Sequence, residues 1–304
     1  MAGMHPLIGP ATRDAALAAL DRVDPDAYAR TRNHLSGAVT RLSAYLTHGV
    51  LGMREVLAHL QRAHALPSHH KLIFELGWRQ YFRHCWHHDG DGIFSSLQAG
   101  PLPDEAYARE LPRDVREGRT GLAVIDLAVR GLYDTGYLHN HARLWLASYV
   151  IHLRKVHWRA GADWMWSHLL DGDLGSNHLS WQWVAGTASA KPYLFNAVNV
   201  RRYAPREWHV DGSALDAGYE QLEGLARTAG AMLESSPVNS GVDEPAVQPT
   251  PPHASGFTEP DAGLNTTAIT TRAVRKGDRY VVNGQKVWTS TASCANKIML
   301  LTRT

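Results

Sequence analysis

One short stretch of the sequence gathers side chains that can do chemistry. Residues 171–183 read DGDLGSNHLSWQW and hold two aspartates, an asparagine, a histidine and two tryptophans. The acids could form a calcium loop, but Gly175 falls at a ligand position of the EF-hand pattern and Gln182 stands where that pattern ends in glutamate. A redox cofactor pocket also combines polar groups with flat aromatic rings, and the sequence favours this alternative.

The histidines do not form a metal motif. Histidine occurs eighteen times, but the runs HNH at 139–141 and HH at 69–70 and 87–88 lack the i, i+4 pairing with a carboxylate that zinc hydrolases use. We interpret them as surface or core imidazoles and expect no metal site in this protein.

The first two thirds of the chain offer the groups that a flavin needs. An isoalloxazine ring requires apolar walls, a basic group near N1 and polar contacts at N3 and N5, and the pyrophosphate requires donors such as the N–H groups at a helix start. Because no GxGxxG motif follows a strand, a dinucleotide would be held without a Rossmann fold. The candidate contacts are Asp171, Asp173, Asn177, Arg79, Arg143, Thr40 and Ser43. These residue types suggest a flavin without specifying one.

Composition and charge narrow the class of protein. The chain has 304 residues, 44% of them hydrophobic, and a formal net charge of +2, so no global basic field marks it as a nucleic-acid binder, although local basic patches remain open. Cys85 and Cys294 lie far apart, which argues against a disulfide framework. We find no run of about 18 apolar residues and no secretory signal. We expect a cytoplasmic protein with no membrane or protein partner.

Residues 12–208 carry the periodicity of helices. The segment REVLAHLQRAHAL places Val56 and Leu60 on one apolar stripe, and strand-like alternation is scarce. The segment TGLAVIDLAVRGLYDTG opens on Thr120, which can cap a helix, and closes on Gly136, a natural helix end. We predict a mainly α fold for this part of the chain.

The sequence changes character near residue 235. Residues 235–255 are rich in proline, serine and acid, which predicts a disordered linker. From 256 to 304, β-branched and polar residues alternate around the turn signals KGD and NG, which predicts short strands. The sequence therefore predicts a helical domain (1–234), a linker (235–255) and a β-rich fragment (256–304).

Four motifs follow one another along the helical domain. They are TRLSAYLTHGVL (40–51), ELGWRQYFRH (75–84), DLAVRGLYDTGYLHNHARLW (126–145) and DGDLGSNHLSWQW (171–183). Together they resemble the helical FAD-binding domain of the DNA photolyase/cryptochrome family over roughly residues 12–208. The resemblance implies an FAD bent into a U among helices, in a chain without the family's N-terminal α/β antenna domain. The cofactor-binding residues that it implies are Tyr28, Thr40, Arg41, Leu42, Ser43, Arg79, Arg143, Asp171, Gly172, Asp173 and Asn177.

The resemblance also implies catalytic roles. Trp181 and Trp158 match the inner and middle members of the family's photoreduction chain, and Tyr107 lies near the place of the outer member. Asn177 would face the flavin N5, and Glu75 matches a carboxylate that hydrogen-bonds the bases of a lesion. These roles imply FAD-dependent, light-driven electron transfer by a lyase of the deoxyribodipyrimidine photolyase type.

The substrate that the resemblance implies is DNA with pyrimidine dimers. Trp78 and Trp183 match the pair that receives a flipped dimer. Asn140 stands where enzymes for the (6-4) photoproduct carry a second histidine, which favours the cyclobutane dimer. The implied DNA-binding residues are Arg32, Glu75, Trp78, Asn140 and Trp183.

Three residues depart from the family pattern. His141 and Leu144 replace an arginine and a methionine that are common near the lesion, and Leu72 replaces a tryptophan near the cofactor. These departures leave open a second function, that of a blue-light-sensing, cryptochrome-like flavoprotein without repair activity.

The β-rich fragment resembles a different family. Residues 256–304 are similar to the middle β-domain of acyl-CoA dehydrogenases and include the motifs TEPDAG and NGQKVWTS. In that family these residues touch FAD and the acyl thioester. We do not find the flanking helical domains or the catalytic glutamate, and a small β-fragment leaves sheet edges unpaired. We interpret the fragment as incomplete, and an acyl-CoA dehydrogenase-like activity of the tail is the third and least favoured function.

Overall fold

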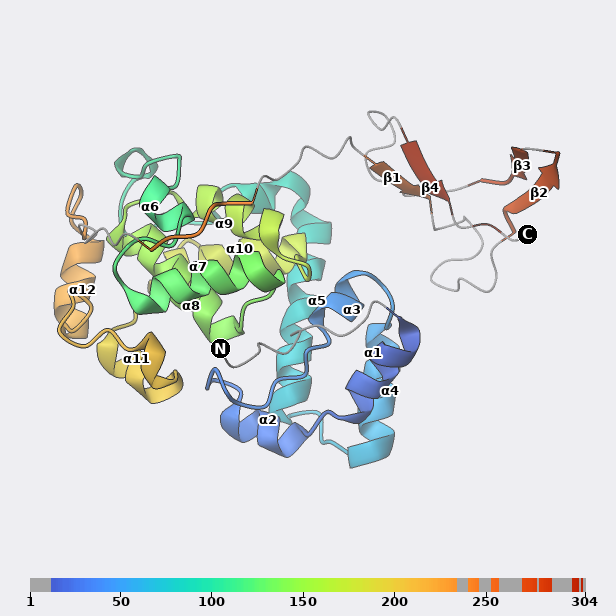
Figure 1. Cartoon of the computed structure of the whole chain (residues 1–304), viewed down its shortest axis with the longest axis horizontal. Coiled ribbons are helices and arrows are strands. Elements are labelled where there is room, and N and C mark those ends of the chain that lie inside the picture. The colour runs from blue at the N-terminus through green and yellow to red at the C-terminus, as the bar shows by residue number, and fades with distance from the viewer. Residues whose placement is uncertain are drawn as a thin grey trace. The chain divides into compact units, whose positions relative to one another are not determined.

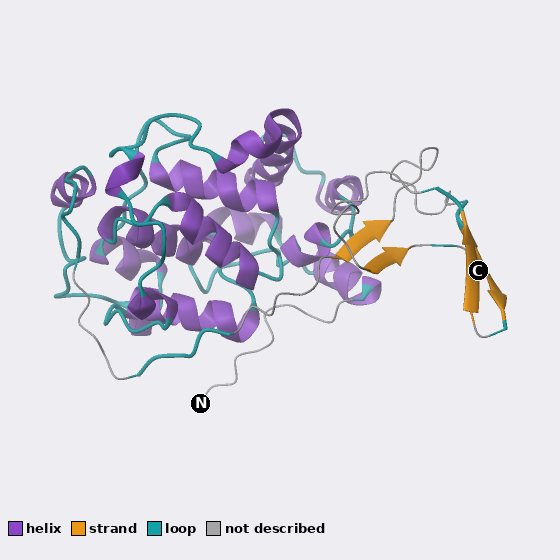
Figure 2. Ribbon diagram, turned by 90° about the horizontal axis from the view of Figure 1, so that it is seen from above, coloured by secondary structure: helices purple, strands orange, loops and turns teal. Residues whose placement is uncertain are grey.

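The chain divides into two units, Met1–Pro245 and Ala246–Thr304. The computed structural model describes residues 12–233, 240–245, 253–256, 270–277, 279–285, 297–300 and 302. In the first unit the described regular structure is helical, and the described strands fall in the second unit (Figures 1 and 2). This confirms the prediction of a mainly α protein with a short β-rich C-terminal part.

The helices of the first unit follow one another with short connections. In order they are α1 (Arg13–Asp21), α2 (Pro25–Thr31), α3 (Ser43–Thr47), α4 (Met53–His64), α5 (Lys71–Asp89), η1 (Gly90–Phe94), η2 (Asp104–Ala106), α6 (Arg113–Arg116), α7 (Ala123–Thr135), α8 (Asn140–Ser148), η3 (Tyr149–Leu153), α9 (Trp158–His168), α10 (Leu174–Ala185), α11 (Ala197–Tyr203), η4 (Arg206–Trp208) and α12 (Tyr219–Ala226). Within the described chain, none of these helices is both long and apolar enough to cross a membrane.

Helix α7 shows how local sequence fixes an element and where the prediction missed. The expected cap, Thr120, is not the N-cap residue, which is Leu122 and makes no side-chain cap. Instead the Asp126 carboxylate accepts hydrogen bonds from the N–H groups of Thr120 and Gly121 and from the Thr120 hydroxyl. The helix ends at Gly136 as predicted, since that residue adopts the left-handed φ of +63° and its N–H bonds a carbonyl one turn back.

Two hydrophobic clusters support the helical unit. The larger one lies among α7, α8, α9 and α10 and includes the fully buried Trp145, Tyr149 and Phe195. The smaller one joins α1, α3 and α4 to the start of α5, where Leu72 is buried. Helix α5 packs against both α2 and α10 and so connects the two parts of the unit (Figure 1).

Helix α10 is buried on several sides rather than along one stripe. It packs against α5, α8 and α9, and its buried residues include His178, Trp181 and Gln182. A helix without a single apolar face belongs inside a domain. The motif at 171–183 therefore starts in the loop before α10 and continues along the central helix of the unit.

The described part of the second unit consists of two strand pairs. Strands β1 (His253–Gly256) and β4 (Lys297–Leu300) pair in parallel. Strands β2 (Arg272–Lys276) and β3 (Arg279–Asn283) form the antiparallel hairpin that the KGD turn predicts, with Gly277 at φ +65°. The TEPDAG motif and most of NGQKVWTS lie outside the described residues.

The stretch predicted as a linker is described only in part. Residues 240–245 lie against the helical unit, where the Val242 N–H donates to the Glu117 carbonyl at 2.9 Å. Residues 253–255 begin strand β1, and residues 235–239 and 246–252 lie outside the described residues. The boundaries of the linker stay a prediction.

Candidate functional site

A cavity lies among α5, α8, α9 and α10, beside the start of α3. It encloses about 630 Å³ of empty space, part of which opens to solvent. The lining combines polar and charged side chains with apolar ones. The lining residues are Ser43, Arg79, Asn140, Arg143, Leu144, Ala147, Met165, Asp171, Asp173, Ser176, Asn177, Ser180, Trp181 and Val184.

The pair of Arg143 and Asp171 holds the more buried carboxylate of the two ion pairs in the cavity wall. Arg143 Nη2 lies 2.9 and 2.8 Å from the two carboxylate oxygens of Asp171, whose side chain is only 3% exposed. Arg143 Nε also donates to the Leu138 carbonyl at 2.9 Å. A buried carboxylate needs such a partner, because an unpaired charge in this position would be strongly destabilising.

A second ion pair joins α5 to the N-terminus of α10. Arg79 Nη2 donates to Asp173 Oδ2 at 3.2 Å and to the Thr47 hydroxyl at 3.0 Å. Asp173 also caps α10, since its Oδ1 accepts from the Ser176 N–H at 2.9 Å. Burial lowers the pKa of the Arg79 guanidinium, and the carboxylates of Asp173 and Asp171 act in the opposite direction. The wall therefore holds two guanidinium groups, each fixed in place by an aspartate.

The apolar side of the cavity depends on a close approach of α9 to α10. A Cβ atom on Gly161 would lie 2.3 Å from the Trp181 ring, so only glycine allows this packing. Trp181 is nearly fully buried and lines the cavity together with Met165 and Val184. A planar apolar ligand can pack against this side.

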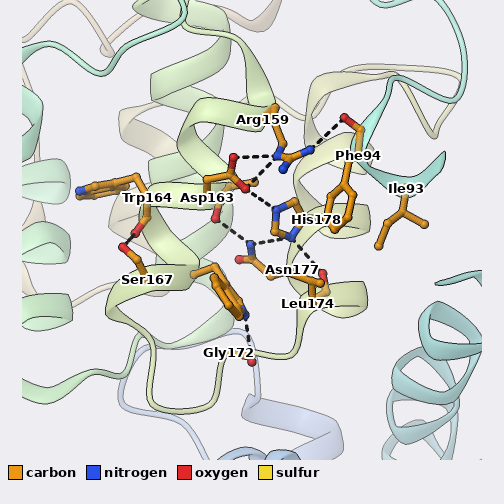
Figure 3. Close-up of polar contacts among 12 residues, drawn as sticks. Ile93, Phe94, Arg159, Asp163, Trp164, Ser167, Gly172, Leu174, Asn177 and His178 are labelled. Carbon is orange, nitrogen blue, oxygen red and sulfur yellow. Dashed lines mark hydrogen bonds and ion pairs between the residues drawn. The ribbon is translucent and has the colours of Figure 1, made fainter. Parts of the chain in front are cut away.

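The amide of Asn177 is oriented by the backbone of α9. Its Nδ2 donates to the Ala162 carbonyl at 2.9 Å, and the ring of His178 lies beside it, with Nδ1 3.5 Å from the same nitrogen (Figure 3). Since this donor atom is directed at Ala162, the amide oxygen is available to a ligand in the cavity.

The structure gathers some of the predicted cofactor residues at the cavity and leaves others outside its lining. Those in the lining are Ser43, Arg79, Arg143, Asp171, Asp173 and Asn177. Those outside it are Tyr28, Thr40, Arg41, Leu42 and Gly172.

The predicted residues outside the lining have other surroundings. Leu42 is buried, and Arg41 before it adopts a left-handed φ of +54°. Gly172 leaves room for the ring of Trp166, whose Nε1 donates to the Gly172 carbonyl. Burial and the nearby Glu75 carboxylate raise the pKa of Tyr28 to about 12, so this phenol stays protonated.

Trp158 lies away from the main cavity, in a row of rings that leads to Tyr107. Its Nε1 donates to the Ser96 hydroxyl at 2.9 Å, and it lines a second, small cavity together with His157 and Tyr107. The ring centroids of Trp158 and His157 are 5.6 Å apart, and those of His157 and Tyr107 are 6.3 Å apart. Tyr107, which the sequence suggests as the outer member of the electron-transfer chain, is thus separated from Trp158 by the His157 ring.

The predicted DNA-binding residues are mostly on the surface. Asn140 lines the cavity, whereas Trp78 and Trp183 are each 41% exposed and do not. Glu75 pairs with Lys71 at 2.7 Å and with Arg32 of the segment after α2 at 3.5 Å. The predicted Arg32 and Glu75 are therefore direct neighbours.

Several lining residues were not predicted, although a simple signal could have found them. Ser176, Ser180 and Val184 lie at i, i+4 and i+8 along α10, on the side of the helix that also carries Asn177 and Trp181. Ala147 is likewise four residues beyond Arg143 on α8, whereas Met165 comes from α9. Helical spacing applied to the predicted residues gives these positions, except for Met165, which needs the packing of α9.

Comparisons with known proteins find relatives of both parts of the chain. Residues 72–211 match the family described as the FAD binding domain of DNA photolyase, and residues 254–304 match the middle domain of acyl-CoA dehydrogenase. A cryptochrome DASH of Gloeobacter violaceus is 34% identical over 209 residues, which cover 65% of this chain and 41% of that protein. A deoxyribodipyrimidine photo-lyase of Synechococcus is 30% identical over 227 residues, covering 65% and 45%.

Solved structures show the same relationship. A cryptochrome of Synechocystis superimposes with a TM-score of 0.56 at 28% identity, over 63% of this chain and 43% of that one. An archaeal photolyase from Sulfolobus tokodaii, at 23% identity and a TM-score of 0.55, shares the fold over 75% of this chain and 53% of its own. The chain spans less than half the length of the two curated relatives named above. Its helical unit belongs to the DNA photolyase/cryptochrome family.

Proposed function

We propose that the helical unit binds FAD and uses it for light-driven electron transfer that splits cyclobutane pyrimidine dimers in DNA. The observation that carries the proposal is the single cavity that brings together two buried Arg–Asp pairs, an oriented amide and an indole. The matched family is a FAD binding domain, so FAD is the cofactor to test against this cavity.

The residues of the cavity fit FAD. Trp181 and Met165 offer an apolar wall for the isoalloxazine ring, and the Asn177 amide oxygen offers a polar contact at its edge. Arg143 and Arg79 supply the positive charge that a flavin and its pyrophosphate require. The ion pairs hold these side chains in place before the ligand binds, which lowers the cost of binding.

The chain's own residues then have separate tasks. Bound FAD supplies absorption of blue light and a transferable electron. The two arginines would present fixed N–H donors to the cofactor, and the apolar side chains would exclude water. Trp181 at the cavity and Trp158 in the next layer are oxidisable rings, and we assign them the role of electron donors from the protein.

The residues that we assign to DNA contact combine exposed rings with polar groups. A flipped base pair needs flat rings to stack on and polar groups that read its edge. Trp78 and Trp183 are exposed enough to stack, and Glu75, oriented by Lys71 and Arg32, can accept hydrogen bonds from bases. Asn140 lines the cavity and would contact the dimer from inside.

The test is repair of a defined oligonucleotide with one cyclobutane dimer. We expect the full chain, with its FAD fully reduced, to restore the absorbance of the two thymines under blue light and not in the dark. Loss of most activity in Glu75→Gln, with FAD content unchanged, would support the assigned role of Glu75. No repair by the parent with fully reduced FAD bound would refute the proposal.

A second function, blue-light sensing without repair, is favoured by one observation. His141, which replaces an arginine common in the family, stacks on Tyr203 at 4.7 Å, and burial lowers its pKa to about 4. It is therefore neutral at pH 7 and offers no charge to a DNA phosphate. Binding of damaged and undamaged duplexes separates the two functions, because a sensor should show no preference for the damaged one.

A further inference from the structure

A row of rings leads from Trp183 to an exposed arginine on α11. Trp183 packs against Tyr193 with a centroid distance of 5.6 Å, and the Tyr193 hydroxyl lies 3.4 Å from His141 Nε2. His141 stacks on Tyr203 at 4.7 Å, and the Arg202 guanidinium lies 5.2 Å from the centre of the Tyr203 ring. The row therefore joins the exposed ring of Trp183 to the exposed side chain of Arg202.

The middle of this row lies next to the cavity. His141 directly follows Asn140, which lines the cavity from the first turn of α8. The end of the row is fixed by the segment after α2, because the Leu35 N–H donates to the Tyr203 carbonyl at 2.8 Å. The backbone that carries Arg202 is thus attached to the same part of the unit as the cavity lining, rather than to a separate surface.

Within the described residues, Arg202 differs from two nearby arginines because it has no carboxylate partner. Arg32 pairs with Glu75 at 3.5 Å, and Arg201 pairs with Asp211. The guanidinium of Arg202 contacts an aromatic ring instead, which restricts its position but leaves its positive charge uncompensated. An exposed, uncompensated guanidinium can donate hydrogen bonds to an anion from another molecule.

The other members of this surface carry no positive charge at neutral pH. Burial is the main cause that lowers the pKa of His141 to about 4, so its ring is neutral at pH 7. Asn140 and Trp183, the neighbouring residues that we assign to DNA contact, are uncharged side chains. A DNA strand carries a negative charge at every phosphate, so Arg202 is the group here that can meet it with an opposite charge.

We propose that Arg202 contacts a phosphate of the DNA strand whose dimer enters the cavity. The inference rests on the proposed function, because it takes the DNA backbone as the ligand. A guanidinium suits this task, since its planar fork of N–H groups matches two phosphate oxygens. The Tyr203 ring restricts the side chain before DNA binds, so less freedom is lost on binding. Phosphate contacts position a strand without reading its bases, so Arg202 would hold the strand while Trp183 stacks on a base.

The test is binding of two labelled duplexes, with and without one cyclobutane dimer, to the full chain in the dark at several salt concentrations. Arg202→Gln should bind both duplexes about tenfold more weakly at about 0.1 M salt, and the slope of log K against log salt should be smaller by about one. The ratio of the two affinities should stay within about twofold of the parent's, because a phosphate carries no information about the lesion. Arg202→Lys keeps the charge and should restore most of the affinity and the slope.

Arg201→Gln is the matched control. It removes a charge one residue away on the same helix, but one that Asp211 already balances, so we expect an affinity within about threefold of the parent's. Equal weakening in Arg201→Gln and Arg202→Gln would overturn the inference, because the effect would then follow from net charge alone. Full affinity of Arg202→Gln, in a parent that prefers the damaged duplex, would overturn the inference and leave the proposed function standing. No binding of either duplex by the parent would overturn both.

Discussion

Two adjacent residues of α5 face opposite surroundings. Arg79 points inward, where its side chain is 14% exposed and paired with Asp173. Trp78 points outward and, with Phe74 and Tyr81, forms a row of exposed rings along the helix. The inner face has its partners within the chain, whereas the outer face is open to a partner from another molecule. The inner face is therefore preorganised by contacts within the chain, whereas the DNA contacts that we propose for the outer face require a second molecule.

Breaking the inner wall should have the largest effect. Arg143→Met leaves the Asp171 carboxylate buried without its partner, which costs about 3–5 kcal/mol. We expect loss of bound FAD, measured by absorbance of the purified protein, and a lower free energy of unfolding in urea. Arg227→Met is the matched control, because Arg227 forms an exposed pair with Glu223 and should cost at most about 1 kcal/mol. Normal FAD content in Arg143→Met would show that the wall is not the cofactor site.

Trp181→Phe separates the inner wall's electron transfer from its packing. Phenylalanine fills much of the same space, so the variant should keep FAD at a cost of about 1–3 kcal/mol in stability. It is much harder to oxidise than indole, so most photoreduction from the oxidised state should disappear, while repair with chemically reduced FAD should continue. Photoreduction as fast as in the parent would mean that Trp181 is ordinary core.

The two faces also differ in how far the sequence could predict them. The motif at 171–183 carries Asp171, Asp173 and Asn177 at fixed spacing. These three site residues could therefore be predicted from the sequence. The pairing of Arg79 with Asp173 spans 94 residues, and the resemblance to a family supplied the role of each residue but not their contact. The pair depends on how α5 and α10 pack, which helical periodicity alone does not specify.

The polar contacts of His178 show more clearly what cannot be predicted from the sequence. Its partner Asp163 lies 15 residues away on another helix, in a sequence with eighteen histidines. No spacing rule distinguishes this histidine from His152, which has a different set of acceptors. Only the three-dimensional arrangement of acceptors around each ring separates them, whereas the mainly α fold follows from the periodicity itself.

Low pH should destabilise the folded protein through a buried histidine. The unfolded chain binds the His152 proton near pH 6.5, and the folded chain binds it only near pH 4, because burial disfavours the charged form. The free energy of unfolding should therefore fall as the pH drops from 6.5 to 4, by on the order of 3 kcal/mol from this group, and level off below. Urea unfolding of the parent and of His152→Gln at pH 7 and pH 4.5 measures the difference. Equal slopes with pH in both proteins would contradict it.

Changes on the outer face should affect DNA and spare the cofactor. Trp183→Ala removes an exposed ring that packs against Tyr193 at 5.6 Å. We expect binding of dimer-containing DNA to weaken by about 1–3 kcal/mol, with FAD content and photoreduction unchanged. Tyr280→Ala, which removes a ring with 58% exposure in strand β3 of the second unit, is the control and should not change DNA affinity. Equal weakening in both variants would assign the effect to general surface loss.

The segment 240–245 resembles the inner wall in one respect. A carboxylate in this segment, like those in the wall, pairs with side chains of the helices. Glu244 lies 2.6 Å from Arg116 Nη1, 3.2 Å from Trp164 Nε1 and 3.6 Å from His168 Nε2. Its side chain is 26% exposed, so the contact is only partly desolvated. Such a pair contributes less than Arg143 with Asp171 does.

Two truncations test how much this segment and the tail contribute. A chain that ends after Pro245 keeps Glu244 and its contacts, so its free energy of unfolding and its FAD content should match those of the full chain within about 0.5 kcal/mol. Removing residues 240–245 as well leaves Arg116 without its carboxylate, while the Trp164 N–H keeps the Tyr133 hydroxyl as acceptor, so the free energy of unfolding should fall by about 1 kcal/mol. Limited proteolysis should cut the full chain between about residues 235 and 255 and leave the flavin with the helical fragment. Flavin that leaves with residues 246–304 would place the cofactor in the tail and refute the assignment of the cavity.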